Sequence, residues 1–142
     1  MTGAGELPLT GGCVCGAVRF EVSEPFVSAT YCHCTRCQRR TGTGSSANAR
    51  TTAEAFRIVS GEDRIRSFKP DAGAEKFFCG ECGSALFSRS GPAGETVGVR
   101  LGAIAGDPGI RPSAHQFVAY AAVWEPIPED GLPRYPERAP PR

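Results

Sequence analysis

The chain has 142 residues, enough for one domain with its own hydrophobic core, and carries 16 Lys+Arg against 15 Asp+Glu. The formal net charge of +1 and the scattered basic residues argue against a nucleic-acid partner or an anionic membrane surface. No apolar run approaches the ~20 residues that a membrane span requires. The segment from Met1 to Leu7 lacks the basic start and apolar stretch of a secretory signal.

Alternation of apolar and polar residues predicts a series of short strands. Val18, Phe20 and Val22 fall on one side of the segment 17–22, which is typical of a half-buried strand. We expect further strands at residues 26–32, 56–59, 65–68, 75–78, 85–89, 96–103 and 116–123. One helical turn is expected at 35–40 and a small-residue loop at 41–46. Short strands separated by turns predict a mainly β domain with two stacked sheets.

Seven cysteines fall in three tight groups, namely Cys13 and Cys15, then Cys32, Cys34 and Cys37, then Cys79 and Cys82. Seven divides naturally into four and three. Four thiolates close a tetrahedral zinc site, whereas three leave one position open for water or substrate. The odd number argues against a complete disulfide framework, and reduced thiols indicate the cytoplasm.

The two outer pairs predict a structural zinc site. Cys13 and Cys15 lie two residues apart, so an extended strand would present both sulfurs to the same side. Cys79 and Cys82, followed by Gly83, resemble a zinc knuckle, a tight turn in which glycine tolerates left-handed backbone. Such binding supplies ~10–16 kcal/mol in zinc-finger peptides. Loss of this site should therefore unfold much of the protein.

The central cluster of Cys32, Cys34 and Cys37 could bind a second zinc ion, with no fourth ligand obvious. An open position would bind an external thiol and deprotonate it, which is typical of a catalytic site. Alternatively, His115 returns to the cluster and completes a second structural site, while His33 points away. A redox-active dithiol is a third interpretation.

These motifs, in this order, resemble the glutathione-dependent formaldehyde-activating enzyme family, also called the family of centromere protein V. The resemblance extends over most of the chain and is carried by the segments 11–20, 32–42, 78–84, 101–102 and 115–117, and by Trp124. It implies a two-sheet, tent-like zinc-binding β fold. It also implies that Cys13, Cys15, Cys79 and Cys82 hold the structural zinc, and that Cys32, Cys34 and Cys37 hold the catalytic one.

The resemblance further implies a carbon–sulfur lyase that joins glutathione to formaldehyde, so that a small thiol and an aldehyde are the expected partners. Glutathione carries two carboxylates, and Arg39 and Arg40 follow the open cluster directly. These two arginines are therefore candidates for binding glutathione, the alternative being a solvated surface pair.

Two questions of organisation remain. After Trp124 the chain is rich in proline, which predicts irregular structure. We therefore divide the chain into a zinc-binding domain at 8–126 and a proline-rich tail at 127–142. A non-catalytic zinc module that binds a protein partner is the alternative function, and the sequence is compatible with a homo-oligomer.

Overall fold

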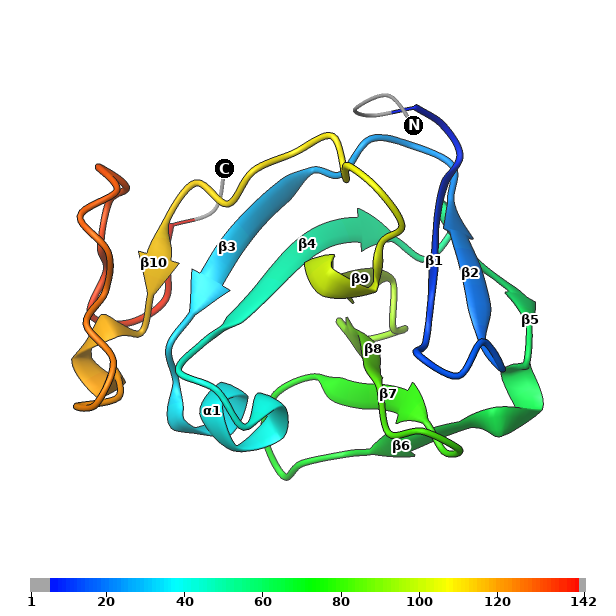
Figure 1. Ribbon diagram of the computed structural model, residues 1–142, viewed down its shortest axis with the longest axis horizontal. Coiled ribbons are helices and arrows are strands. Elements are labelled where there is room, and N and C mark those ends of the chain that lie inside the picture. Colours follow the sequence, from blue (N-terminus) through cyan, green and yellow to red (C-terminus); the bar gives the residue numbers. More distant parts are fainter. Residues whose placement is uncertain (1–5, 141–142) are drawn as a thin grey trace.

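The computed structural model describes residues 6–140, so most of the segment from Met1 to Leu7, considered above as a secretory signal, lies outside the described residues. Within these described residues, ten strands form two sheets (Figure 1). The smaller sheet has the order β1-β2-β5, with β1 at Leu9–Gly12, β2 at Arg19–Val22 and β5 at Phe56–Ser60. All its pairs are antiparallel.

The larger sheet has the order β10-β3-β4-β9-β8-β7-β6. Its strands are β3 (Ser28–Cys32), β4 (Ser46–Thr52), β6 (Ile65–Phe68), β7 (Glu75–Cys79), β8 (Ala85–Ser90), β9 (Thr96–Arg100) and β10 (His115–Gln116). Only β10 pairs in parallel with its neighbour β3, and the other pairs are antiparallel. The predicted mainly β, two-sheet architecture is confirmed.

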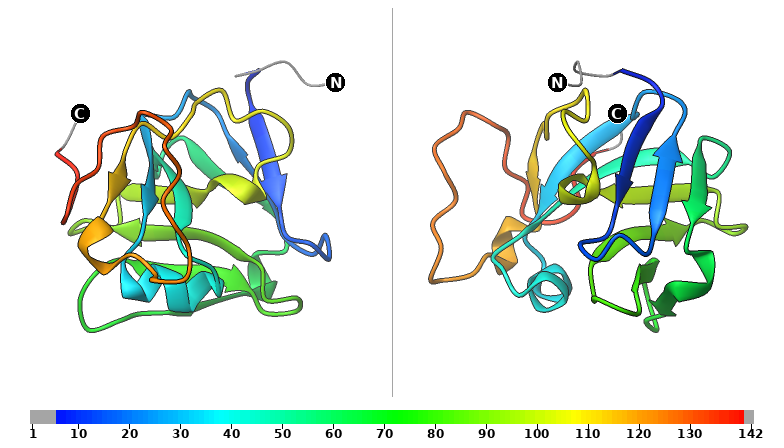
Figure 2. Two further views of the ribbon diagram at one scale, coloured as in Figure 1. Left: turned by 60° about the vertical axis from the view of Figure 1, so that its left-hand side comes forward. Right: turned by 45° about the vertical axis from the view of Figure 1, so that its right-hand side comes forward.

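Helical structure is short. The α-helix α1 (Thr35–Thr41) lies between β3 and β4, and three 3-10 turns are η1 (Glu62–Arg64), η2 (Leu101–Ala103) and η3 (Val118–Tyr120). In residues 6–140, no helix has the length and apolar character needed to cross a membrane. Figure 2 shows the smaller sheet standing against one end of the larger sheet, with α1 below β3 and β4.

The core fills the space between the two sheets. The inward side chains of the first predicted strand are almost inaccessible to solvent, as the alternation predicts, with Val18 and Val22 at 0% and Phe20 at 1% exposure. A row of rings then crosses the core, since Phe56 lies 5.1 Å from Phe20 and 4.6 Å from Phe87 between ring centroids. Burial of these aromatic and branched side chains holds the two sheets together.

Most predicted strands occur close to their expected positions, but two predicted strands are shorter than expected and two observed strands were missed. The predicted strand at 116–123 is reduced to the two residues of β10, because Phe117 adopts the left-handed conformation with φ of 60°. The predicted strand at 96–103 ends at Arg100, where η2 begins. The strand β4 at Ser46–Thr52 was not predicted at all, and neither was β1.

The proline-rich segment is irregular through residue 140, as far as the structure describes it, yet it packs on β10. The His115 amide donates to the carbonyl of Pro133 at 2.9 Å, and the Tyr135 amide donates to the carbonyl of His115 at 2.8 Å. Farther along, the Phe117 amide donates to Glu137 at 2.8 Å. The division into a domain at 8–126 and a tail at 127–142 stays a prediction, but this part of the tail is held in place.

Gly61 provides a test of how closely the chain around β5 approaches the chain around β2 within the smaller sheet. It follows β5 with φ of 81°, and a Cβ atom at this position would overlap the carbonyl oxygen of Ala17. We expect Gly61→Ala to lower the free energy of unfolding by about 2–4 kcal/mol, combining left-handed strain with overpacking. Urea denaturation measures the change.

Gly131→Ala is the matched control for Gly61→Ala. Gly131 has φ of 77° but no atom within 4 Å of its added Cβ, so only the conformational cost of about 1 kcal/mol applies. Equal losses in the two variants would contradict the close approach of Gly61 to Ala17.

Candidate functional site

The two outer cysteine pairs come together in space. The sulfurs of Cys13, Cys15, Cys79 and Cys82 all lie within 4.8 Å of one another. The distance between sulfurs is 3.6 Å for Cys13 and Cys15 and 3.8 Å for Cys15 and Cys79, so these thiols are free rather than disulfide-bonded. Cys13 and Cys79 are buried, whereas Cys15 and Cys82 reach the surface.

Two tight turns produce this arrangement. Cys13 and Cys15 lie in the turn between β1 and β2, not in an extended strand as predicted, and Gly16 with φ of 83° allows the chain to reverse there. Gly83, with φ of 82°, does the same after β7, where its amide donates to the carbonyl of Cys79 at 2.8 Å. The two turns are tied together by the Val14 amide, which donates to the Ser84 hydroxyl at 3.1 Å.

The four sulfurs suit a tetrahedral metal ion. Zinc–thiolate bonds of about 2.3 Å in a tetrahedron imply sulfur–sulfur separations of about 3.8 Å, close to the two distances above. Backbone amides already point at the sulfurs, since Val18 donates to Cys13 at 3.2 Å and Glu81 donates to Cys79 at 3.4 Å. Such bonds stabilise thiolate ligands. Cys13, Cys15, Cys79 and Cys82 could therefore hold one metal ion.

The second cluster is built where β3 passes into α1. The sulfurs of Cys32, Cys34 and Cys37 also lie within 4.8 Å of one another. Cys32 ends β3, Cys34 is the N-cap of α1, and its sulfur accepts a hydrogen bond from the Cys37 amide at 3.3 Å. The helix turn thus folds Cys37 back over the two preceding thiols, so that three ligand atoms converge on one point.

The thiols of the second cluster share a proton unequally. The hydrogen bond from Cys32 lowers the pKa of Cys37 to about 5, against the opposing effect of burial, and a hydrogen bond from Ser46 adds to the lowering. The same Cys37 interaction, with burial, raises the pKa of Cys32 above its usual range. The thiolate is the form that binds metal, so the lowered pKa of Cys37 favours metal binding at this cluster.

Positive charge gathers around Cys37. Burial lowers the pKa of Arg40 and of Lys76, and for both groups the Cys37 thiolate opposes that effect while Arg100 reinforces it. Among the described residues, none of these three cations forms a salt bridge with a carboxylate. Cations left without acidic partners near a reactive thiol favour an anionic ligand.

The structure separates the two predicted arginines. The Arg40 guanidinium lies 5.9 Å from the centroid of the Phe78 ring, and its buried Nε and Nη2 atoms have no hydrogen-bond partner. Arg39, in contrast, is exposed. Arg40 therefore points into the charged region beside the cluster, and Arg39 fits the solvated alternative. Sequence reasoning missed Lys76 and Arg100, which reach this region from β7 and β9.

His115 does not join the three sulfurs, which is one of the alternatives considered above. Its Nδ1 atom lies 2.9 Å from Nε2 of His33, and its Nε2 atom lies 2.8 Å from the carboxylate of Asp130. The Tyr31 ring stacks on His115 at 4.9 Å between centroids. Among residues 6–140, the second cluster therefore contains three cysteines and no fourth side-chain ligand.

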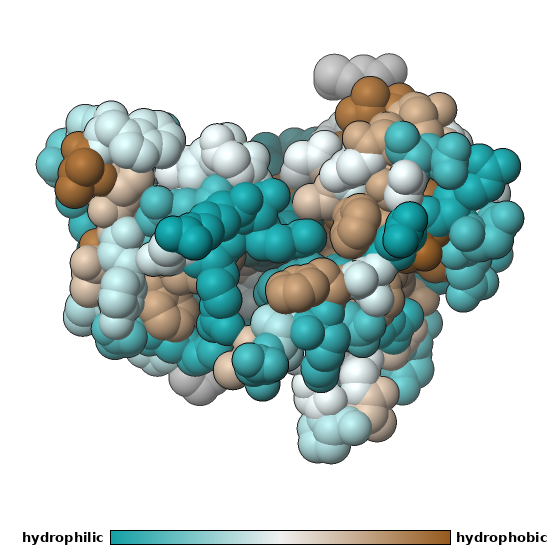
Figure 3. Space-filling view, turned by 90° about the horizontal axis from the view of Figure 1, so that it is seen from below, coloured by the Kyte–Doolittle hydropathy of each residue, from teal (hydrophilic) through white to brown (hydrophobic). Residues whose placement is uncertain are grey.

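One face of the larger sheet is polar and leads to this cluster. Ser46, Asn48 and Arg50 alternate along β4, and strand pairing sets Ser46 opposite Cys32 and Asn48 opposite Arg100. Asn48 accepts a hydrogen bond from Arg100 at 2.6 Å and donates one to Ser46 at 2.9 Å. The face seen from below in Figure 3, where α1 and β6 lie, is likewise mostly hydrophilic.

The chain matches one known protein family over most of its length. Residues 8–120 match the family described as glutathione-dependent formaldehyde-activating enzyme. The chain belongs to this family. The match includes every cysteine of the two clusters and ends before the proline-rich segment. The family takes its name from a formaldehyde-activating enzyme that requires glutathione.

Individual relatives agree with this assignment. A protein of Halomonas elongata, provisionally named a glutathione-dependent formaldehyde-activating enzyme, is 33% identical over 86 residues, which cover 56% of this chain and 54% of that protein. The chain thus matches about half the length of this relative. A crystal structure of a Rhodobacter sphaeroides protein superimposes with a TM-score of 0.58 at 24% identity, covering 88% of this chain and 98% of the other, and shows a shared fold.

Proposed function

We propose that the chain is a zinc-dependent enzyme of the carbon–sulfur lyase type that adds glutathione or a related thiol to formaldehyde or a related aldehyde. The observation that supports this most directly is the cluster of Cys32, Cys34 and Cys37, three convergent sulfurs with no fourth side-chain ligand among the described residues. Three protein ligands and one free position are typical of catalytic rather than structural zinc.

In this proposal the two clusters have different tasks. Cys13, Cys15, Cys79 and Cys82 would hold a structural zinc, and Cys32, Cys34 and Cys37 would hold the catalytic one. The catalytic zinc would supply Lewis acidity that favours the thiolate form of a thiol at the free position. A reducing compartment such as the cytoplasm would keep all seven cysteines available as ligands.

The surrounding residues would orient the reactants. The thiol sulfur forms a bond to the aldehyde carbon, the π electrons of the carbonyl group move to its oxygen, and the thiol proton ends on that oxygen. Arg40, Lys76 and Arg100 lie where positive charge would stabilise both the thiolate and the developing oxyanion. The Nε and Nη2 atoms of Arg40, which are buried and without a partner among the described residues, could donate hydrogen bonds to such an anion.

Metal content and reaction rate together test the proposal. We expect elemental analysis to find two zinc ions per chain, one for each cluster, with the second ion accessible to glutathione. In the cobalt-substituted protein, a thiol that enters the free position should change the thiolate-to-cobalt absorption. NMR exchange spectroscopy should show faster interconversion of free and glutathione-bound formaldehyde than in buffer alone.

The same measurements separate the enzyme from a non-catalytic zinc module. Two zinc ions whose spectra do not respond to any thiol, together with an exchange rate equal to that in buffer, would contradict the proposal. A protein with zinc only at the four-sulfur cluster would contradict it as well, because the second site would then be a set of free thiols.

A further inference from the structure

A chain of hydrogen bonds through two buried histidines leads from the second cysteine cluster to the proline-rich segment. His33 is 5% exposed and His115 is 3% exposed, and the Nε2 atom of His33 lies 2.9 Å from Nδ1 of His115. The Nε2 atom of His115 lies 2.8 Å from the carboxylate of Asp130. These three side chains have no part in the proposed chemistry. Buried polar groups that satisfy one another in this way fix the relative positions of the elements that carry them.

Asp130 fixes the direction of both hydrogen bonds. The bond from His115 lowers the pKa of the Asp130 carboxyl, which keeps this group ionised. A carboxylate only accepts, so Nε2 of His115 carries the hydrogen and donates to Asp130. A neutral imidazole has one N–H group, so Nδ1 of His115 accepts from Nε2 of His33. Without the carboxylate, His115 could carry its hydrogen on Nδ1 and would then lose the bond from His33.

At one end, the chain of hydrogen bonds holds the backbone of the second cluster. His33 lies between the ligand candidates Cys32 and Cys34. Its amide donates to the carbonyl of Gln116 at 3.0 Å, and its carbonyl accepts from Nε2 of Gln38 at 2.8 Å. The ring, the amide and the carbonyl of His33 are therefore all bonded, which restricts the backbone that carries the two neighbouring sulfurs. Partners of this kind, one step removed from the ligands, orient metal ligands in proteins.

At the other end, the chain of hydrogen bonds holds a segment that has little else to keep it in place. None of the residues 127–140 is buried, and the segment is irregular. Segments with few buried contacts open locally at low free-energy cost. A second, more exposed link runs beside the first, since Gln38 also donates to the carbonyl of Tyr120 at 2.9 Å and the Tyr120 hydroxyl donates to the Glu137 carboxylate at 2.9 Å. Both links thus join residues beside the cluster to carboxylates of the segment.

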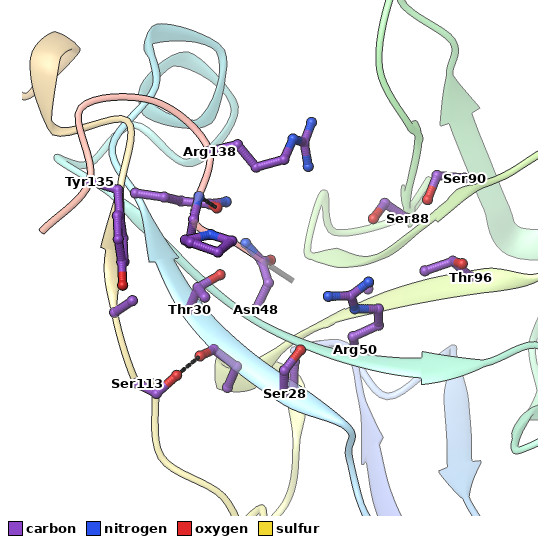
Figure 4. A pocket seen from close by; sticks show the side chains of 17 residues that line it. Ser28, Thr30, Asn48, Arg50, Ser88, Ser90, Thr96, Ser113, Tyr135 and Arg138 are labelled. Atoms are coloured by element: carbon purple, nitrogen blue, oxygen red, sulfur yellow. Dashed lines mark hydrogen bonds between the residues drawn. The ribbon is translucent and has the colours of Figure 1, made fainter. Parts of the chain in front are cut away.

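The position of this segment determines the shape of a cavity. A polar cavity of about 550 Å³ is lined by residues of β3, β4, β8 and β9, and the side chains of Tyr135 and Arg138 complete its wall (Figure 4). Because Tyr135 and Arg138 belong to the segment 127–140, the cavity keeps this wall only while the segment is docked on β10.

We propose that the chain from His33 through His115 to Asp130 couples metal binding at the second cluster to docking of the segment 127–140. The inference rests on the second metal site of the proposed function and adds a means of regulating that site. Ligation would fix Cys32 and Cys34, and with them the His33 ring that the docked segment needs. By thermodynamic linkage, docking strengthens metal binding by the same factor. Asp130 lies beyond residues 8–120, the part of the chain that matches the family.

Hydrogen exchange of single amides, measured by NMR, tests the coupling in protein with two zinc ions and in protein from which a chelator has removed one. The Tyr135 amide donates to His115, and the Phe117 amide donates to Glu137. We expect both amides to exchange about tenfold faster after the second zinc is removed. The Gly83 amide, bonded to the Cys79 carbonyl at 2.8 Å, should not change, which shows that the four-sulfur cluster is still loaded.

Asp130→Ala should remove the coupling from both sides. In this variant the amides of Tyr135 and Phe117 should exchange fast with either zinc content, and competition with a chelator should show the second zinc bound about tenfold more weakly. Glu129→Ala is the matched control, because it removes the neighbouring carboxylate, which is 97% exposed and lies 3.8 Å from Arg134. It should keep the zinc affinity and the exchange rates of the unaltered protein.

The outcomes separate this inference from the proposed function. Equal exchange with one and two zinc ions, or a zinc affinity that Asp130→Ala leaves unchanged, would show that the histidines only pack the segment. The inference would then be wrong, and the proposed function would stand if glutathione alters the spectrum of cobalt in the second site. Coupling without any response of cobalt to glutathione would support the inference and contradict the proposed function. Uptake of a single zinc ion by the unaltered protein would contradict both.

Discussion

Cys79→Ser is expected to abolish cooperative unfolding of the protein at ordinary temperature. Cys79 has 0% exposure, and its sulfur lies 3.8 Å from that of Cys15, which is 64 residues away in the sequence. The four-sulfur cluster therefore joins the β1–β2 turn of the smaller sheet to the β7–β8 turn of the larger sheet. Metal binding at such sites supplies ~10–16 kcal/mol in zinc-finger peptides, which is comparable to the ~5–15 kcal/mol stability of a whole domain.

Circular dichroism during heating measures the effect, and Cys34→Ser is the matched control. Both changes replace one cysteine with serine, but Cys34 is half-buried at the N-cap of α1. Serine is a favoured N-cap residue, so its hydroxyl can accept the bond from the Cys37 amide. We therefore expect Cys34→Ser to unfold cooperatively at nearly the original temperature and Cys79→Ser to lack a sharp transition.

Equal behaviour of the two variants would contradict the assignment of a structural role to one cluster and a reactive role to the other. If both proteins melt as the parent does, the four-sulfur cluster does not hold the sheets together. If both lose the transition, the second cluster also supports the fold and is a structural site.

The strands that could be predicted from the sequence are those in which apolar and polar side chains alternate and the residues also favour extended backbone. Apolar and polar residues alternate strictly around Val18, Phe20 and Val22. Phe20 and Val22 form the buried face of β2, and Val18 is buried just before this strand begins. The strand β4 does not follow this pattern, because small residues such as Ala47 and Ala49 have low strand propensity. It is a strand because β3 and β9 pair with it on both sides, a tertiary contact that no local pattern contains.

In the candidate site, too, some residues could be predicted from the sequence and others could not. The short spacings within the second cluster already bring its three sulfurs together, and the structure realises this through the N-terminal turn of α1. The cations Lys76 and Arg100 come from β7 and β9, far along the chain from the cluster. Their convergence depends on strand order, which the sequence pattern did not reveal. Arg40 could be proposed because it follows the cluster directly.

Loss of activity without loss of fold is the second large effect that we expect, again from Cys34→Ser. In the proposed function, removing one of three sulfurs would leave the catalytic zinc with two thiolate ligands and a weaker neutral oxygen. Because even changes to groups that only support metal ligands cost 10–100-fold, kcat/KM for glutathione and formaldehyde should fall by more than about a hundredfold. Zinc content should fall from two ions per chain toward one.

Arg39→Gln is the control for this loss, because Arg39 lies exposed on the same helix and should be dispensable. Exchange spectroscopy of formaldehyde and glutathione provides the rate, and elemental analysis of the same samples provides the zinc content. A Cys34→Ser protein that keeps both zinc ions and its full rate would show that the chemistry takes place away from this cluster. A protein that keeps both ions but loses the rate would instead place Cys34 among the groups that act on the thiol, since ligation alone would then survive the change.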